Sequence, residues 1–156
     1  MAAIRAQLKR LLHLDEPPHR TALAFAVGTF IAFSPAYGLH TLMVFFCAWA
    51  FRLNVIALLA GAFINNPWTL VPILGGTLWT GFLLLGIPQA PPFHWNDLSL
   101  NSLYEQIMPY LIPFVAGGLF LGVLAALISY PLAYAVIIHY RRRIRGSTAR
   151  LPHESS

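Results

Sequence analysis

Apolar residues occupy three long runs in this chain, at 20–52, 54–86 and 109–140. Each run is apolar enough to lie in a lipid bilayer as helix, and a more polar stretch at 87–108 separates the second run from the third. No run shows the strict alternation of a half-buried strand. The pattern predicts an all-α integral membrane protein with a membrane domain at 20–140.

Both ends of the chain are polar and basic. In residues 1–19, the apolar Ile4, Leu8 and Leu11 recur at helical spacing, with Arg5 and Lys9 between them. This spacing predicts an N-terminal amphipathic helix on the membrane interface, followed by a linker. Residues 141–156 are predicted to be a basic cytoplasmic tail.

Two of the three runs are interrupted by proline. Ser34-Pro35-Ala36-Tyr37-Gly38 divides the first run, and Asn65-Asn66-Pro67-Trp68-Thr69 divides the second. Proline removes a backbone donor and disfavours helix at the preceding residue, so each run is predicted to break there. The segments before the breaks span about 15–18 Å as helix, too little for a hydrocarbon core of roughly 30 Å. They predict proline-broken helices of the re-entrant type.

The distribution of charge supports a membrane location. Hydrophobic residues make up 58% of the chain and charged residues 10%, whereas a soluble domain is about 25% charged. From Thr21 to Tyr140, Arg52 is the one basic residue, and Asp97 and Glu105 are the acids. The net charge of +5 therefore describes two basic flanks. Such flanks favour contact with anionic lipid headgroups over nucleic acid.

The basic flanks also constrain the topology. Both termini are predicted to be cytoplasmic, and the loop at 87–108 external because it lacks Lys and Arg. Residues 20–86 must then cross the membrane once. A cytoplasmic Arg52 makes 20–52 a re-entrant hairpin and 54–86 a broken crossing helix; an external Arg52 reverses these roles. Because so few spans cannot enclose a path, a homo-oligomer is expected.

Uncharged polar groups at the two breaks are the main functional signal, because they need partners inside hydrocarbon. The amides of Asn65 and Asn66 either bind a phosphate, hydroxyl or cation, or cap the ends of the half-helices. Thr69 opens the next helix, where free backbone amides would offer an anion site. Trp68 is more typical of a packing or interface aromatic.

Three residues outside the asparagine–proline block are also candidates. His40 is ionisable and follows the first break, although a neutral imidazole often has a purely structural role. Arg52 and Asn54 join the two runs, where Arg52 would pair with a lipid phosphate or fix the topology. The candidate substrate-binding residues are Ser34, Pro35, Gly38, His40, Arg52, Asn54, Asn65, Asn66, Pro67, Trp68 and Thr69.

Glycines suggest close helix contacts. Gly28-Thr29-Phe30-Ile31 precedes Pro35 much as Gly61-Ala62-Phe63-Ile64 precedes Pro67, a weak internal repeat of the kind that builds transporter sites. Gly118 and Gly122 have small-xxx-small spacing, which favours helix packing inside one subunit or between two.

Signatures of catalysis are missing from the sequence. It contains no Gly-x-Ser-x-Gly, His-Glu-x-x-His, phosphate-loop or dinucleotide-binding motif. The membrane segments hold no acid, and Cys47 is the single cysteine. The chain is therefore expected to be no enzyme and to have no metal or cofactor site.

Residues Phe25 to Gly86 resemble a family of small bacterial membrane proteins catalogued as domain of unknown function 2062. The resemblance rests on Ala26-Val27-Gly28-Thr29-Phe30, Ser34-Pro35, Gly38-Leu39-His40, Arg52-Leu53-Asn54 and Asn65-Asn66-Pro67-Trp68-Thr69. Family members occur alone or beside glycosyltransferase-like domains, which implies work on lipid-linked sugars or their carriers. The resemblance also implies the bacterial cytoplasmic membrane as the location.

These observations favour transport or flipping of an anionic lipid-linked substrate such as a polyprenyl phosphate carrier. One alternative is a non-enzymatic membrane scaffold that recruits an envelope glycosylation or lipid enzyme through its basic ends. Another is a small-solute or ion channel, although the lack of acids in the membrane segments counts against cation selectivity.

Overall fold

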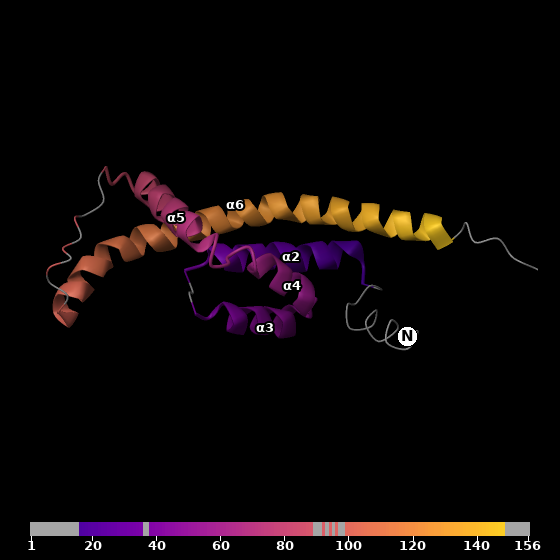
Figure 1. Cartoon of the computed structure of the whole chain (residues 1–156), viewed down its shortest axis with the longest axis horizontal. Coiled ribbons are helices and arrows are strands. Elements are labelled where there is room, and N and C mark those ends of the chain that lie inside the picture. The colour runs from indigo at the N-terminus through magenta and orange to yellow at the C-terminus, as the bar shows by residue number, and fades with distance from the viewer. Residues whose placement is uncertain are drawn as a thin grey trace, which may run out of the picture.

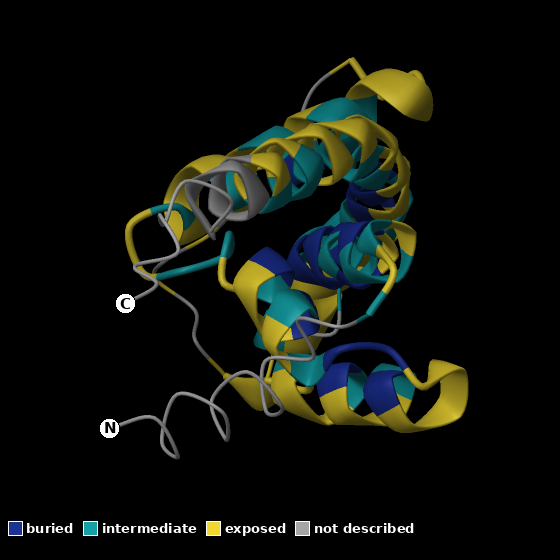
Figure 2. Cartoon of the chain, turned by 90° about the vertical axis from the view of Figure 1, so that its right-hand side faces the viewer, coloured by how far each residue is buried: buried dark blue, intermediate teal, exposed yellow. Residues whose placement is uncertain are grey.

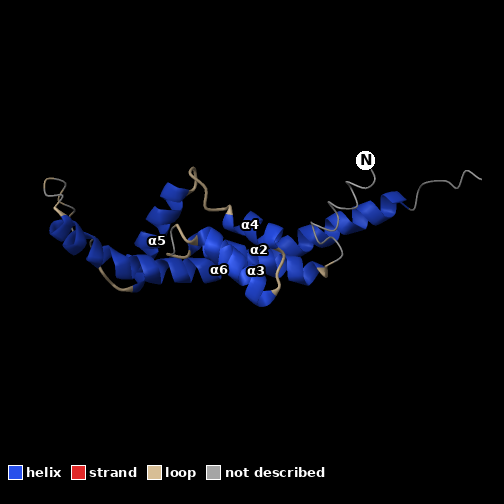
Figure 3. Cartoon of the chain, turned by 90° about the horizontal axis from the view of Figure 1, so that it is seen from below, coloured by secondary structure: helices blue, strands red, loops and turns tan. Residues whose placement is uncertain are grey.

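The computed structural model describes residues 16–35, 38–88, 92, 94, 96 and 99–148, with side chains up to Arg142. These residues form five α-helices and no strand, which confirms the all-α prediction for this part of the chain (Figures 1 and 3). The helices are α2 (Pro18–Phe33), α3 (His40–Phe51), α4 (Val55–Ala62), α5 (Leu70–Leu84) and α6 (Leu100–Thr148). The amphipathic helix predicted near the N-terminus lies outside the described residues.

One helix is long and apolar enough to cross a bilayer. It is the Leu100–Arg142 part of α6, while α3 and α5 are apolar but shorter than a span. Figure 1 shows α6 as the longest element, running beside α5 and then α2. Helices α2 and α5 thus pack along this one long helix, while α3 and α4 pack on α2.

Helices α2 and α3 form an antiparallel hairpin (Figure 1). Arg20 connects the start of α2 to the end of α3. Its guanidinium donates to the carbonyl oxygens of Arg52 at 2.8 Å and Phe51 at 3.4 Å. Arg52 ends α3 in the left-handed conformation, with φ of 51°. A cation on the last carbonyls of a helix is favourable because those groups have no intrahelical donors. Arg20 and Arg52 therefore lie at the same end of the hairpin.

Both predicted breaks occur. Helix α2 stops at Phe33, before Pro35, and Gly38 in the following turn has a φ of 86° that favours glycine. Helix α4 stops at Ala62, before Pro67, and α5 starts at Leu70. Ala36 and Tyr37 of the first break lie outside the described residues.

The last helix is longer than the predicted range 109–140. It begins at Leu100, because Ser99 supplies a cap: its hydroxyl accepts from the Ser102 amide at 3.4 Å and its carbonyl from the Leu103 amide at 2.9 Å. The prolines at 109, 113 and 131 lie inside the helix without ending it. Prolines are tolerated in membrane helices where neighbouring groups satisfy the freed carbonyls. The external loop predicted at 87–108 is correspondingly shorter.

Glycines bring α2 and α4 into backbone contact. A Cβ on Gly28 would lie 2.1 Å from the Leu58 carbonyl oxygen, and one on Gly61 would lie 2.1 Å from that of Phe25. In each case the contacted oxygen belongs to the residue three positions before the opposite glycine. The two members of the predicted repeat thus pack against each other in equivalent ways, as small residues permit in membranes.

A second close contact joins α5 and α6. A Cβ on Gly81 would lie 1.8 Å from the Pro113 carbonyl oxygen, and one on Gly117 would lie 1.8 Å from that of Thr77. The glycines with small-xxx-small spacing face α2 instead: Gly118 lies against the Phe33 carbonyl, and Gly122 lies against Phe30. This spacing therefore serves packing within one chain.

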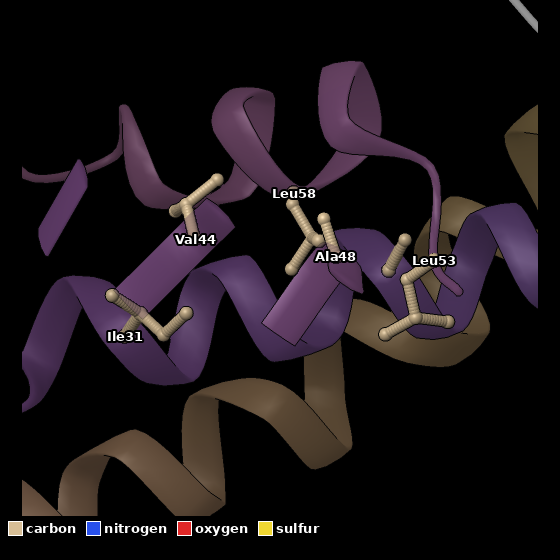
Figure 4. Packing of buried hydrophobic residues seen from close by; sticks show 6 residues of the cluster. Ile31, Val44, Ala48, Leu53 and Leu58 are labelled. Atoms are coloured by element: carbon tan, nitrogen blue, oxygen red, sulfur yellow. The ribbon is translucent and has the colours of Figure 1, made fainter. Parts of the chain in front are cut away.

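The buried core is small and lies among the first three helices. Ile31, Val44, Ala48, Leu53 and Leu58 meet there, contributed by α2, α3, the connection after α3, and α4 (Figure 4). Many large apolar side chains outside this core are exposed. Figure 2 shows exposed residues along the helices. Trp49 on the outer side of α3, for example, is 79% exposed. A surface of this kind is suited to lipid.

Candidate functional site

The two breaks meet at a pocket of about 400 Å³, which we call the turn pocket. Its walls come from the start of α3, the end of α4, the turn that follows α4 and the start of α5. Its lining residues are His40, Thr41, Val44, Leu59, Ala62, Phe63, Asn65, Asn66, Pro67 and Leu70. Four residues of the predicted site, His40, Asn65, Asn66 and Pro67, are therefore brought together.

The Ala32 carbonyl connects the two breaks. Ala32 lies in the last turn of α2, where carbonyls need partners from outside the helix. The Asn65 side-chain amide donates to this oxygen at 3.0 Å, and the His40 imidazole hydrogen-bonds the same carbonyl. Asn65 and His40 thus hold the turn after α4 and the start of α3 against the end of α2.

Asn66 caps the turn that leads into α5. Its side-chain oxygen accepts from the amides of Trp68 at 3.0 Å and Thr69 at 3.1 Å, while the Thr69 hydroxyl oxygen accepts from the Asn66 amide at 2.9 Å. This reciprocal arrangement is a capping box, with Pro67 at the favourable first position. The amides predicted to be free for an anion at Thr69 are therefore occupied by Asn66.

The neighbouring helix starts differ in their capping. Helix α4 is capped by Asn54, which is 4% exposed and accepts from the Ile56 and Ala57 amides at 3.0 and 3.2 Å. Among the described residues, no side chain caps the start of helix α3, and its first residues, His40 and Thr41, line the turn pocket. The amino end of α3 therefore presents its partial positive charge to the pocket.

The family model described as "Uncharacterized protein conserved in bacteria (DUF2062)" matches residues 1–145. The chain belongs to this family. The match extends beyond the Phe25–Gly86 region that carried the resemblance. No curated protein and no solved structure matches the chain. A bacterial family and one helix of membrane-spanning length are together consistent with membrane association.

The other predicted site residues of this DUF2062 protein do not line the turn pocket, and of these Trp68 and Thr69 hydrogen-bond the lining residue Asn66. Ser34 is buried, with its hydroxyl 3.8 Å from the Met43 sulfur, and Trp68 is 90% exposed. Arg52 and Asn54 lie beyond the far end of α3, about 18 Å from the pocket for a helix of its length. The structure does not bring these residues together with His40 and Asn65.

Two residues of the DUF2062 protein were missed from the sequence. Thr41 lines the turn pocket beside His40, and its position just after a Pro–Gly turn was the available signal. Arg20 joins the ends of α2 and α3, a contact that no local pattern indicates. Among the described residues, no group of three His, Cys, Asp or Glu side chains is placed to hold a metal ion.

We expect Asn66→Ala to lower the free energy of unfolding by about 1–2 kcal/mol, because the Trp68 and Thr69 amides lose their acceptor. Asn66→Asp keeps the acceptor and should restore most of the loss. Unfolding in mixed detergent micelles measures both, with the exposed Asn101→Ala as the control. Equal losses for the alanine and aspartate variants would contradict the capping role.

Proposed function

We propose that this DUF2062 protein moves an anionic lipid-linked substrate, such as a polyprenyl phosphate carrier, across the bacterial cytoplasmic membrane. The proposal rests on one observation: the uncapped amino end of α3 opens into the turn pocket. Helix amino ends bind phosphate through backbone amides and the helix dipole. A volume of about 400 Å³ lies within the range of small-molecule sites.

The lining of the pocket suits an amphipathic ligand. His40, Thr41 and Asn65 supply polar groups, while Leu59 and Phe63 supply apolar surface. Phe63 is 74% exposed, so the apolar side of the pocket continues onto the outer surface. A phosphate would bind at the polar groups while its hydrocarbon chain stayed in the surrounding lipid.

The depth of the pocket supports a role in translocation. In the proposed topology, α2 and α3 are a re-entrant hairpin, α4 and α5 make one broken crossing, and α6 returns to the cytoplasm. Arg20 and Arg52 then mark the cytoplasmic end of the hairpin, as the positive-inside rule favours. The 12 residues of α3 place the pocket about 18 Å deeper, near the middle of a roughly 30 Å core. There it would serve as a polar intermediate site for a headgroup.

We further propose that the protein acts as a homo-oligomer and is not an enzyme. Helices α2 and α5 pack on α6, and α3 and α4 pack with α2 around one small core, an arrangement that leaves the turn pocket open on the apolar side of Phe63. Additional copies would shield a crossing headgroup from hydrocarbon, where an uncompensated charge is costly.

The double variant His40→Ala/Asn65→Ala is expected to reduce translocation to the rate of protein-free vesicles. Both substitutions remove polar groups that face the pocket and leave the cap at Asn66 intact. The measurement is the loss of a fluorescent polyprenyl phosphate from the outer leaflet of proteoliposomes. His139→Ala/Asn101→Ala makes the same chemical changes at exposed positions of α6 and should keep full activity.

Circular dichroism and unfolding in detergent are the controls that check whether the double variant remains folded. Wild-type-level translocation by the folded variant would overturn the assignment of the turn pocket. Wild-type protein that moves no labelled carrier at all would remove the transport proposal.

A further inference from the structure

A second hollow runs along the contact between α2 and α6. It has a volume of about 330 Å³ and is apolar, with walls that include Leu23, Ala26 and Phe30 of α2 and Val123, Ala126 and Tyr130 of α6. We call it the seam groove. It lies on a different part of α2 from the contact with α4, and the turn pocket shares none of its residues.

Side-chain contacts lie at both ends of the seam groove. At the inner end, the Phe30 ring lies so close to Gly122 that a Cβ on this glycine would be 3.1 Å from it. At the outer end, the Tyr130 hydroxyl hydrogen-bonds His19 Nδ1, and the Tyr130 ring stacks on Tyr134. A helix is 10–12 Å wide with its side chains, so a groove of about 330 Å³ is too small for a helix of a second copy. A single hydrocarbon chain is thin enough for a groove of this volume.

Arginines lie beyond the outer end of the seam groove. A further hollow of about 260 Å³ is lined by Pro18 of α2 and by Ile138, Arg141 and Arg142 of α6. Residues 123, 127, 130, 134, 138 and 141 follow one another at steps of three or four, so they share one face of α6. Helical side chains lean toward the amino end, which directs Arg141 toward Ile138 and the groove.

The two hollows together are long enough for one lipid and follow its order of polarity. From Val123 to Arg141 the helix rises about 27 Å, compared with about 20 Å for one leaflet including its interfacial region. The order along the two hollows is apolar, then the Tyr130 phenol with the His19 imidazole of α2, then guanidinium. Along α6, residues 106–142 contain no acid that would oppose an anion at the arginines, and on the side of α2 Glu16 lies two residues before Pro18.

We infer that the contact between α2 and α6 binds one anionic phospholipid, with a hydrocarbon chain in the seam groove and its phosphate on Arg141 and Arg142. This lipid is a stationary component of the fold, separate from the substrate proposed for the turn pocket. The inference depends on membrane location but not on transport, so either can fail without the other.

The test is lipid retention by the full-length protein, counted by native mass spectrometry after exchange with phosphatidylglycerol or phosphatidylcholine of identical chains. We expect one retained phosphatidylglycerol and a preference for it of about 30-fold, since each arginine contributes about fivefold. Ala126→Phe should abolish retention of both lipids by filling the groove. Val136→Phe, at a position of α6 that is 67% exposed, is the matched control and should retain the lipid.

Arg141→Gln/Arg142→Gln tests the headgroup contact without altering the groove. It should abolish the preference for phosphatidylglycerol while one lipid is still retained. Lipid retention by Ala126→Phe equal to that of Val136→Phe would overturn the site. The site would also be overturned if the wild-type protein retained both lipids equally. The same holds if Ala126→Phe changed the oligomeric state and kept its lipid. If Ala126→Phe does not fold, the arginine variant alone decides.

Discussion

Gly81→Ala is expected to lower the free energy of unfolding by about 1–3 kcal/mol, whereas Gly75→Ala, in the same helix, should raise it by up to about 1 kcal/mol. The difference arises from the surroundings of the two glycines. A Cβ at Gly81 would lie 1.8 Å from the Pro113 carbonyl oxygen, while a Cβ at Gly75 would meet nothing within 4 Å. Both substitutions add one methyl group to α5, so helix propensity cancels in the comparison.

The loss at Gly81 follows from backbone contact. A carbonyl oxygen inside a helix cannot move aside as a flexible side chain can, so α5 and α6 must separate. Separation also loosens the contact between Phe82 and Tyr110, whose ring centroids lie 5.9 Å apart. Gly117, which lies against Thr77 and Gly81, shares the same contact.

Unfolding in mixed detergent micelles measures both variants. A third variant, Gly81→Ala/Gly117→Ala, should cost less than the sum of the two single changes, because the first already opens the contact. Equal stabilities for Gly81→Ala and Gly75→Ala would show that α5 and α6 do not pack through these glycines.

The breaks in the helices were predictable because their causes are local. Pro35 and Pro67 act on the residues immediately before them, and Gly38 adopts a positive φ that favours glycine. The start of α6 was not predicted, because the polar residues near 100 outweighed the capping signal of Ser99. The lack of Lys and Arg in residues 87–108 bears on which side of the membrane this segment faces, but it does not show that the segment is a loop.

The partners of the polar residues were only partly predictable. The need of Asn65 and His40 for partners followed from their apolar surroundings, and both meet the Ala32 carbonyl. That carbonyl is 33 positions before Asn65, so no local pattern identified it. For Asn66 both roles were left open from the sequence, and its contacts are those of a cap. Its hydrogen bonds leave α3 as the uncapped helix start at the turn pocket.

The glycine repeat was visible in the sequence, but the packing it produces was not. Gly28 and Gly61 occupy equivalent positions, each against the backbone of the other helix. Beyond the two breaks the halves diverge, since α3 returns beside α2 and α4 while α5 packs on α6. The helix after the first break therefore packs back on its own half of the repeat, and the helix after the second break packs on α6 instead. The turn pocket lies between the starts of these two helices.

Thr41→Asp should lower the affinity for a polyprenyl phosphate roughly 100-fold while making the fold slightly more stable than the wild type. Thr41 is exposed in the first turn of α3 and lines the turn pocket. A carboxylate there complements the helix dipole, which favours the folded state by about 0.3–1 kcal/mol. It also repels a bound phosphate by about 3 kcal/mol at 5 Å and an effective dielectric constant of 20. Stability and binding should therefore change in opposite directions.

Thr41→Asn is the matched control, because asparagine has nearly the shape of aspartate without its charge. Binding of labelled polyprenyl phosphate and of the uncharged polyprenol should be measured for both variants. Thr41→Asp should bind polyprenyl phosphate weakly and polyprenol as the wild type does, while Thr41→Asn should bind both as the wild type does. Equal phosphate affinities for the two variants would mean that the amino end of α3 does not hold the anion. The comparison of the two variants therefore tests whether the phosphate headgroup binds at the turn pocket.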